Sequence, residues 1–362
     1  MEARVVMLCL LWGAAVAKWN RNRTTASLPD EIAFQVYVAF DNVLHTAFSN
    51  ENEAQKYAVV FFNAINIIFQ NMTNPKIKFE VVMFHGQFLN FTGPALTLES
   101  NEVDAHKSLT SIDKFILDKA QFSASDILFV FSGRKVFTKG WNNKKEYSPQ
   151  GLTWEGGICN SSRKIVIVSD IGKNFEALPN AGFQLARLLG APTACTPHFY
   201  KLRGNVELFR LSECAMNNIT RNLEELHRKH PEHARECFRR RYQRTLSFHY
   251  LDLPHRMTDE NDFCTKVIGK LEEWQSSGIC NRTDMQRFLD RVYDSVHTKN
   301  FVTSRSNQCV FDCCMLDFFT FQYKFQSFYA FDGKPCGEIY NYRNRRNCVL
   351  GACVAQNYTL PL

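Results

Sequence analysis

The sequence lacks any apolar run long enough to cross a membrane. The run at its start, Val5 to Ala14, is too short to span a bilayer, and no later stretch is long enough. Arg4 precedes this run and Ala15-Val16-Ala17 follows it, which is the order of a basic residue, an apolar core and a small-residue cleavage site in a secretory signal. We therefore expect residues 1–17 to be a signal peptide and the mature protein to be soluble, secreted and extracellular.

The sequence also lacks the signatures of several functional classes. No Ser-His-Asp or Cys-His nucleophile pattern is present, and no nucleic-acid-binding motif is found. The formal net charge of +7 is modest for 362 residues. Two basic clusters could bind anionic glycans weakly, although such runs are more often a solvated face. The clusters are Arg239, Arg240, Arg241 and Arg244, and Arg343, Arg345 and Arg346.

Cysteine, by contrast, is abundant. The chain has 13 cysteines; Cys9 lies in the signal, and the others can all pair in an oxidising compartment. Only Cys159 and Cys195 precede Cys214, so we predict a first domain stabilised by its core and a second stabilised by disulfides. The expected boundaries are 18–30 for a linker, 31–245 for the first domain and 255–362 for the second.

Asn-x-Ser/Thr sequons are frequent and, behind a signal peptide, predict a glycoprotein. Because glycans need solvent, these asparagines should lie in loops or at the edges of elements. The seven sequons are at Asn22, Asn71, Asn90, Asn160, Asn218, Asn281 and Asn357.

The hydrophobic pattern predicts an α/β fold. Segments of alternating or continuous apolar residues predict strands, and segments with apolar residues at helical spacing predict helices. Their order favours a sheet with helices packed on it. The predicted strands are Ile32–Phe40, Lys76–Phe84, Asp126–Phe131 and Lys164–Val168, and the predicted helices are Glu53–Phe69 and Asp104–Phe122.

A further helix is predicted around the segment from Phe183 to Thr193. Its spacing matches H-E-x-x-H-x-x-G-x-x-H, in which histidines bind zinc and the glutamate is the general base. Gly190 keeps the place where such a helix ends, and Pro192 follows it. The simpler interpretation is an amphipathic helix that packs its leucines into a core.

The chemistry of this frame is absent. The three ligand positions hold Phe183, Arg187 and Thr193, and the general-base position holds Gln184. Phenylalanine has no lone pair, arginine stays cationic, and a neutral hydroxyl is a poor zinc ligand. An amide cannot accept a proton from water. We therefore predict no catalytic base, no bound zinc and no cofactor at this helix.

The surrounding sequence resembles secreted metzincins of the reprolysin type, the snake-venom and ADAM-like metalloproteases, with the closest likeness to metalloproteases of tick saliva. The likeness covers about residues 30–245. The matching features are the Asp126–Gly133 strand and turn, Trp154-Glu-Gly-Gly-Ile-Cys159 before an edge strand, the degenerate helix, Cys195, and Cys214-Ala-Met216.

This resemblance implies a fold, pairings and a turn. The fold is a metzincin-like domain, a twisted mixed sheet with packed helices, followed by a small disulfide-rich domain. The implied disulfides are Cys159–Cys237 and Cys195–Cys214, and Met216 would lie in the methionine turn under the metal. Such proteases also carry a long pro-segment, whereas only about a dozen residues separate the signal from the first predicted strand.

The C-terminal part carries the most intact motif. Asp332–Gly337 followed by Cys348–Cys353 resembles the cysteine-rich modules that follow such catalytic domains. Asp-Gly predicts a tight turn, and disulfides involving Cys336, Cys348 and Cys353 would stabilise a segment too small for its own core. The aromatic-rich stretch Phe318–Phe331 is either an exposed binding strip or, as we favour, a hairpin that buries alternate aromatics against the first domain.

Three histidines offer an alternative metal site. His227, His230 and His233 recur every third residue, and neighbours at this spacing can share a helix face. Pro231 should break or start a helix there. The spacing matches no hydrolytic zinc motif, and a solvated polar turn is the more common outcome.

These features favour a secreted, glycosylated pseudoprotease that binds an extracellular host protein, such as one of haemostasis or immunity, without cleaving it. An edge strand beside the former cleft could accept an extended peptide. Two alternatives stay open. One is an active zinc metalloendopeptidase with an unrecognised site, and the other is adhesion through the C-terminal cysteine-rich module.

Overall fold

The structure is a computed structural model, and part of the chain is described. The described residues are 27–85, 96–117, 122, 125–140, 142–147, 151–170, 173–195, 200–202, 206–208, 211–239, 252–258, 260, 263–264, 275–279, 309–317, 322–336, 346–349 and 352–355. The expected signal peptide and the sequons at Asn22, Asn90, Asn281 and Asn357 lie outside these ranges. Within them, no helix has the length and apolar character needed to cross a membrane.

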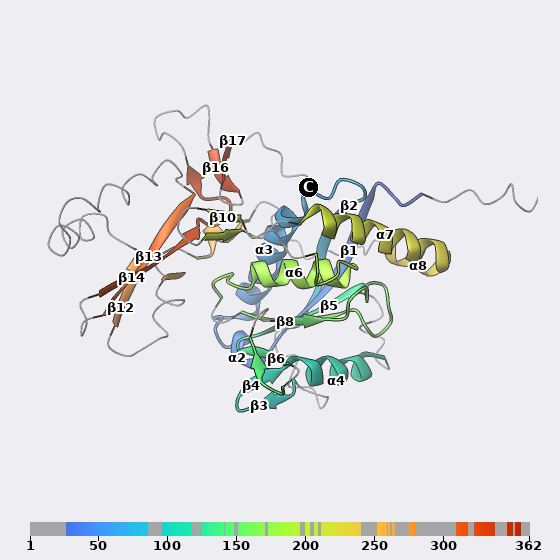
Figure 1. Cartoon of the computed structure of the whole chain (residues 1–362), viewed down its shortest axis with the longest axis horizontal. Helices are drawn as coiled ribbons and strands as arrows, with labels where there is room; N and C mark the ends of the chain where they lie inside the picture. Colours follow the sequence, from blue (N-terminus) through green and yellow to red (C-terminus); the bar gives the residue numbers. More distant parts are fainter. Residues whose placement is uncertain are drawn as a thin grey trace, which may run out of the picture.

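A five-stranded mixed sheet forms the centre of the N-terminal region (Figure 1). The strand order is β2-β1-β5-β9-β8; the first four strands are parallel and β8 is antiparallel to β9. The four predicted strands are confirmed to within one residue at either end. The strands are β1 (Glu31–Phe40), β2 (Lys76–His85), β5 (Ile127–Ser132), β8 (Gly151–Thr153) and β9 (Ile165–Ser169).

Helices cover both faces of this sheet. In Figure 1, α3 (Glu51–Phe69) and α6 (Leu178–Leu188) lie on one side, and α4 (Ala105–Leu117) lies on the other. The alternation of β1 explains the two layers, because Phe34 packs into the α3 and α6 cluster whereas Tyr37 packs into the α4 cluster. The mixed α/β architecture expected from the sequence is therefore the observed one.

The two predicted helices form with shifted ends. Helix α3 starts two residues early because Asn50 acts as its N-cap and accepts a hydrogen bond from the Glu53 N–H at 2.9 Å. Helix α4 ends at Leu117 among the described residues. Edge-to-face aromatic contacts fill the core above the sheet, as between Phe61 and Phe131, whose ring centroids are 4.7 Å apart.

A second sheet beside α4 was not predicted from the sequence. Its strands are short and rich in charge, and ion pairs connect them: Lys145 lies 2.9 Å from Glu102, and Lys139 lies 2.8 Å from Glu99. The strand order is β3-β4-β6-β7. The strands are β3 (Leu98–Glu99), β4 (Glu102–Asp104), β6 (Val136–Lys139) and β7 (Lys145–Glu146).

Three further helices and a hairpin form before residue 252, and the hairpin lies beside the C-terminal strands (Figure 1). Ser212 caps α7 by accepting a hydrogen bond from the Ala215 N–H at 3.1 Å. Pro231 is the first residue of α8, so the expected helix boundary at this proline is confirmed. The elements are α2 (Asn42–His45), α7 (Glu213–Lys229), α8 (Pro231–Arg239), β10 (Tyr200–Leu202) and β11 (Val206–Leu208).

The C-terminal region consists of two small antiparallel sheets held by disulfides. The sheets are β12-β13-β14 and β15-β16-β17. Three disulfides lie among the described residues of this region, Cys264–Cys313, Cys309–Cys348 and Cys336–Cys353. The elements are the 3-10 helix η2 (Pro254–Arg256) and strands β12 (Gln275–Ile279), β13 (Val310–Asp317), β14 (Gln322–Tyr329), β15 (Pro335–Cys336), β16 (Arg346–Val349) and β17 (Ala352–Ala355).

The described part of the aromatic-rich stretch supplies β14, which forms a hairpin with the preceding strand β13. Its described aromatics pack mainly within the C-terminal region: Phe311, Phe328 and Phe331 surround Phe263, with ring centroids 4.9–5.7 Å from it. Phe331 also contacts the core above the central sheet. The expectation that the hairpin packs against the N-terminal region therefore holds only for Phe331 among these rings.

Residues 252–264 connect the two regions. On one side, Asn63 of α3 donates to the carbonyl oxygen of Asp252 at 3.0 Å. On the other side, His255 lies 3.3 Å from the carbonyl oxygen of Asp332, and Lys334 pairs with Glu260. The boundary expected at residue 255 thus falls inside a segment that contacts both regions.

Candidate functional site

Helix α6 carries the degenerate zinc-helix frame. Gly190 has a φ of +109°, in the left-handed region. The Gly190 N–H donates to the Arg187 carbonyl, and the Ala191 N–H donates to the Ala186 carbonyl, both at 2.9 Å. These two bonds form a Schellman motif, so the expected stop at Gly190 is confirmed. The amphipathic interpretation also holds, because the leucines at 185, 188 and 189 are fully buried.

Helix α7 closes the end of α6. The Asn222 side-chain amide donates to the carbonyl oxygen of Leu189 at 3.0 Å. A Cβ placed on Gly190 would lie 2.5 Å from the Asn222 Cβ. Position 190 therefore requires glycine for two reasons: the backbone has a positive φ, and α7 approaches too closely for a side chain.

Gln184, at the general-base position, acts as a connector. Its side chain is fully buried, and its Nε2 donates to the carbonyl oxygen of Gly151 in β8 at 3.0 Å. Its Oε1 is buried and has no hydrogen-bond partner among the described residues. The side chain that would activate water in a protease of this frame thus joins α6 to the edge of the sheet.

The three ligand positions point to different surroundings. Phe183 is half-buried and packs against the core above the sheet. Arg187 is 18% exposed, and its guanidinium lies 3.6 Å from the Glu155 carboxylate. Thr193 is exposed and lies beyond the end of α6. An aromatic ring, a cation and an exposed neutral hydroxyl cannot form a zinc site, so the residues present do not fit the metal that the frame implies.

Met216 does not lie in a turn. The resemblance places it in a methionine turn, but in the structure it is in the first turn of α7 and packs against the core. The physical reason is the N-cap: Ser212 fixes the start of α7 at Glu213, so the residues after it are helical.

Two disulfides lie close to the C-terminal end of α6: one joins the segment before β9 to α8, and the other joins the residues after α6 to α7. They are Cys159–Cys237 and Cys195–Cys214, the pairings that the resemblance implies. Cys159 ends the Trp154–Cys159 segment, whose backbone also bonds to α6: the Gly156 N–H donates to the Arg187 carbonyl at 2.9 Å. The C-terminal end of α6 is therefore fixed by this backbone bond and by the Cys195–Cys214 disulfide shortly after it in the chain.

The three histidines do not converge. His233 contacts the carbonyl oxygen of Cys159, His230 is the exposed C-cap of α7, and His227 packs beside the Phe238 ring at 6.2 Å. Both ring nitrogens of His227 are buried without a hydrogen-bond partner among the described residues. Each imidazole has a different environment, which does not fit a shared metal ion.

The edge strand is β8, and it is covered. The sequence places an edge strand after the Trp154–Cys159 segment, but β8 precedes that segment and β9, which follows it, lies inside the sheet. The β8 residues are buried; Leu152 is 9% exposed and Thr153 is 3% exposed. The Thr153 hydroxyl donates to the Ile165 carbonyl at 2.6 Å. A peptide could therefore add to this edge only after the residues packed over β8 had moved away.

Sequence reasoning missed a polar cluster at the carboxyl ends of the parallel strands. Asp41, directly after β1, is fully buried and accepts hydrogen bonds from the backbone N–H groups of Leu44 and Gly133 at 2.8 and 2.9 Å and from the Ser132 hydroxyl. Arg134 lies 3.3 Å from the same carboxylate. The signal was available, since Asp41 follows one buried strand and Ser132 ends another. With these donors the carboxylate has a structural role.

Tyr57 and Asp170 form a second buried polar contact near this cluster. The Tyr57 hydroxyl donates to the Asp170 carboxylate and accepts from the Phe175 N–H at 2.9 Å. Burial, followed by the nearby negative charge of Asp170, raises the pKa of Tyr57 well above its ordinary value. The tyrosine therefore stays neutral and connects α3 to the segment after β9.

A basic hollow of about 500 Å³ lies on the outer side of α4. The expected arginine clusters lie outside the described side chains, except for the exposed Arg346. The hollow is one place where described residues bring basic side chains together. Its lining residues are His106, Lys107, Thr110, Ser111 and Lys114.

The fold and the site define an α/β protein with a helix-covered mixed sheet, a disulfide-rich C-terminal region and a zinc-helix frame without ligands. No family model matches the chain, and no curated protein matches it. Solved structures that are similar include metalloproteinase-II from Bacteroides fragilis, with 11% identity and a TM-score of 0.33 over 56% of this chain and 58% of that chain. A chain from "Structure of a chaperone-substrate complex" has 12% identity and a TM-score of 0.31 over 44% of this chain and 26% of that chain. At these scores neither similarity assigns a function.

Proposed function

We propose that the protein is a secreted, glycosylated pseudoprotease that binds an extracellular protein without cleaving it. The observation that carries the proposal is the hydrogen bond between Gln184 and Gly151. In a protease with this helix frame, the residue at position 184 must present a base to water. Here the side chain is fully buried and its amide is used to hold β8.

The ligand positions support the same conclusion. Phe183 contributes to the core, and Arg187 pairs with Glu155 at 3.6 Å. At these positions the side chains contribute packing and an ion pair in place of metal ligands. The end of the helix and both neighbouring disulfides are nevertheless present and hold the scaffold together. Because one fold can serve different functions, a scaffold without this chemistry can still act by binding.

The partner is proposed from the resemblance to the metalloproteases of tick saliva. It would be an extracellular host protein, such as one of haemostasis or immunity. Because Leu152 and Thr153 of β8 are covered, strand addition at this edge would require the edge to open. We therefore propose that the partner binds to the exposed surface of the scaffold. Strand addition after opening of the β8 edge would be a second way of binding.

Zinc content and proteolysis test the loss of catalysis. The full chain is secreted in zinc-supplemented medium, dialysed, and assayed for zinc per chain and for cleavage of gelatin and fibrinogen with and without a chelator. We expect zinc well below one ion per chain and no chelator-sensitive cleavage. Stoichiometric zinc together with chelator-sensitive cleavage would overturn the proposal and favour an active metalloendopeptidase.

Binding is tested separately, by surface plasmon resonance of the full chain against purified haemostatic and complement proteins. We expect saturable binding to at least one of them. Binding that disappears only on changing exposed residues of the cysteine-rich region would favour adhesion through that module. Absence of binding to every protein of the panel would remove the proposed partner class.

A further inference from the structure

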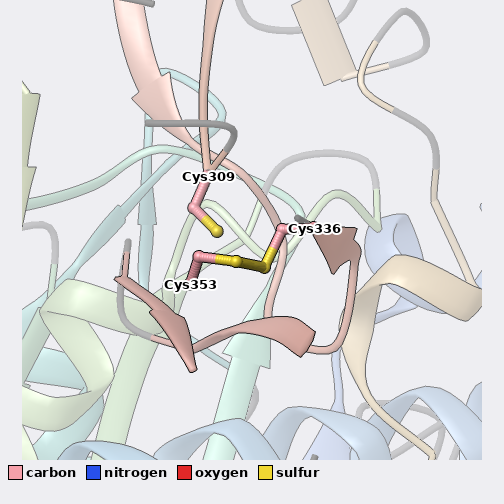
Figure 2. A group of neighbouring side chains, drawn as sticks. All are labelled: Cys309, Cys336 and Cys353. Carbon is pink, nitrogen blue, oxygen red and sulfur yellow. A yellow bond between two sulfur atoms is a disulfide. The ribbon is translucent and has the colours of Figure 1, made fainter. Parts of the chain in front are cut away.

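A disulfide of the C-terminal region lies beside a cysteine that belongs to a second disulfide (Figure 2). The sulfur atoms of Cys309, Cys336 and Cys353 all lie within 4.8 Å of one another. They belong to different bonds, because Cys336 pairs with Cys353 whereas Cys309 pairs with Cys348. Figure 2 shows the Cys309 sulfur directed toward the Cys336–Cys353 bond. One half of a disulfide thus lies beside both sulfurs of its neighbour.

The two bonds differ in their access to solvent. Cys309 and Cys348 are fully buried, whereas Cys336 and Cys353 are half-buried. Thiol–disulfide exchange requires a thiolate to reach a sulfur atom. A small thiol in solution can therefore attack the Cys336–Cys353 bond but cannot directly reach the Cys309–Cys348 bond.

The strand register supplies a further contact. Cys348 of β16 lies directly opposite Cys353 of β17 in an antiparallel pair. Residues opposite each other in such a pair have Cα atoms about 4.5–5.5 Å apart, within the range that a disulfide spans. The sulfur distances and this register therefore allow the four cysteines to be paired in a second way, Cys309–Cys336 and Cys348–Cys353.

We propose that these four cysteines form an exchange site, in which attack by a low-molecular-weight thiol on the exposed disulfide is passed to the buried one. The thiolate attacks Cys353, forms a mixed disulfide and releases Cys336 as a thiolate. Cys336 attacks Cys309, forms Cys309–Cys336 and releases Cys348 as a thiolate. Cys348 attacks Cys353 in the mixed disulfide, forms Cys348–Cys353 and releases the original thiol. No net oxidation or reduction occurs, and the thiol is regenerated.

The exchange changes what holds the β16–β17 hairpin. In the observed pairing, Cys309–Cys348 joins it to the start of β13, and Cys336–Cys353 joins it to β15. In the exchanged pairing, Cys348–Cys353 links the two strands of the hairpin to each other, and neither of the two bonds joins the hairpin to β13 or β15. The hairpin carries Val349, which packs with Ile67 of α3 and Leu253. Exchange would therefore loosen a contact between the C-terminal region and α3 of the N-terminal region.

Disulfide mapping after mild thiol treatment tests the proposal. The full chain is treated with reduced glutathione under native conditions, quenched with N-ethylmaleimide, digested and analysed by mass spectrometry. We expect Cys309–Cys336 and Cys348–Cys353 to appear together and without net free thiol, while Cys264–Cys313, which is fully buried and outside the sulfur group, persists. Loss of Cys309–Cys348 before Cys336–Cys353 reacts, or reduction without new pairs, would overturn it.

A variant pair tests the relay directly. In Cys336→Ser/Cys353→Ser, we expect the same treatment to leave Cys309–Cys348 intact. The matched control, Cys195→Ser/Cys214→Ser, removes a disulfide outside the sulfur group and should exchange as the parent does. Equal exchange of Cys309–Cys348 in both would refute the relay.

If the first variant is not secreted, Cys348→Ser gives an independent test. It leaves Cys309 as a thiol beside the exposed bond, and we expect a new Cys309–Cys336 or Cys309–Cys353 pair without added glutathione. In the matched variant Cys195→Ser, Cys214 should remain a free thiol. A Cys309 that also remains free would contradict the proposal.

Discussion

The side-chain amide of Gln184 donates a hydrogen bond to the backbone carbonyl of Gly151, 33 residues earlier in the chain, at 3.0 Å. This bond joins α6, the helix with the zinc-protease frame, to β8, the edge strand beside it. It depends on an amide, because a glutamate at the same place would direct carboxylate oxygens at a carbonyl oxygen. The general base of the frame and the structural bond seen here are therefore mutually exclusive.

Gln184→Glu should destabilise the protein at neutral pH by about 1–3 kcal/mol, the cost of an unsatisfied buried polar group. Burial should raise the pKa of the new carboxyl. A raised folded-state pKa means that its stability contribution is present in acid, where the carboxyl is neutral and can donate to Gly151, and is lost as pH rises. Urea unfolding of variant and parent at several pH values measures this.

The control for this substitution is Gln55→Glu, the same change at a half-exposed position of α3. It should shift stability by no more than about 0.5 kcal/mol, as surface substitutions do. Equal effects at positions 184 and 55, or a Gln184→Glu variant that becomes more stable with rising pH, would contradict the structural role of this amide.

Gly190→Ala should destabilise by about 1–3 kcal/mol, the cost of holding a non-glycine residue in a strained backbone region. The new Cβ would also lie 2.5 Å from the Asn222 Cβ. Asn222→Gly removes that contact and also the cap on Leu189. A double-mutant cycle measured by thermal unfolding should therefore be less than additive. Strict additivity would show that the two positions do not interact.

Much of this fold could be predicted from the sequence, and the failures have physical causes. Parallel strands such as β5 are buried on both faces and appear as continuous apolar runs. Strand β8 has three residues, too few for any periodicity. The resemblance places Met216 in a turn, whereas Ser212 is a residue that can start a helix just before it. The role of Gln184 depends on a carbonyl contributed by another strand, which no local pattern contains.

Acidification should weaken the junction between the two regions through His255. Burial lowers the pKa of His255 below its ordinary value, and its Nδ1 lies 3.3 Å from the Asp332 carbonyl. Because the unfolded chain then binds a proton more readily than the folded chain, stability is present above the ordinary histidine pKa and is lost as pH falls through it. Unfolding of the parent should therefore become easier between about pH 7 and about pH 5.

His255→Asn is the test, since asparagine can donate from nearly the same position as Nδ1 and does not titrate. The variant should show a smaller loss of stability on acidification than the parent, measured as the urea midpoint at each pH. His230→Asn, at the exposed C-cap of α7, serves as control and should follow the parent. A His255→Asn variant with the same pH dependence as the parent would remove His255 as the cause.

Among the sequons in the described residues, we expect some asparagines to carry a glycan and one to remain largely unmodified. Asn71 and Asn160 are exposed, in agreement with the expectation that sequons lie in loops or at edges. Asn218 departs from it, because it lies within α7 and is half-buried. Its Nδ2, the atom that would carry the glycan, donates to the Cys214 carbonyl at 2.9 Å and to the Cys195 sulfur at 3.3 Å.

An amide nitrogen has two hydrogens, and a glycan replaces one of them. At Asn218 both are engaged, so attachment would break a contact inside the disulfide-linked turn. At Asn71 the amide nitrogen donates one hydrogen bond, to the Leu211 carbonyl at 3.1 Å, so its second hydrogen can be replaced by a glycan. Glycopeptide mapping of the secreted protein should find Asn71 and Asn160 occupied and Asn218 largely unoccupied. Asn218→Ala should leave the glycan mass unchanged, whereas Asn160→Ala should lower it by one glycan. Full occupancy of Asn218 would contradict this prediction.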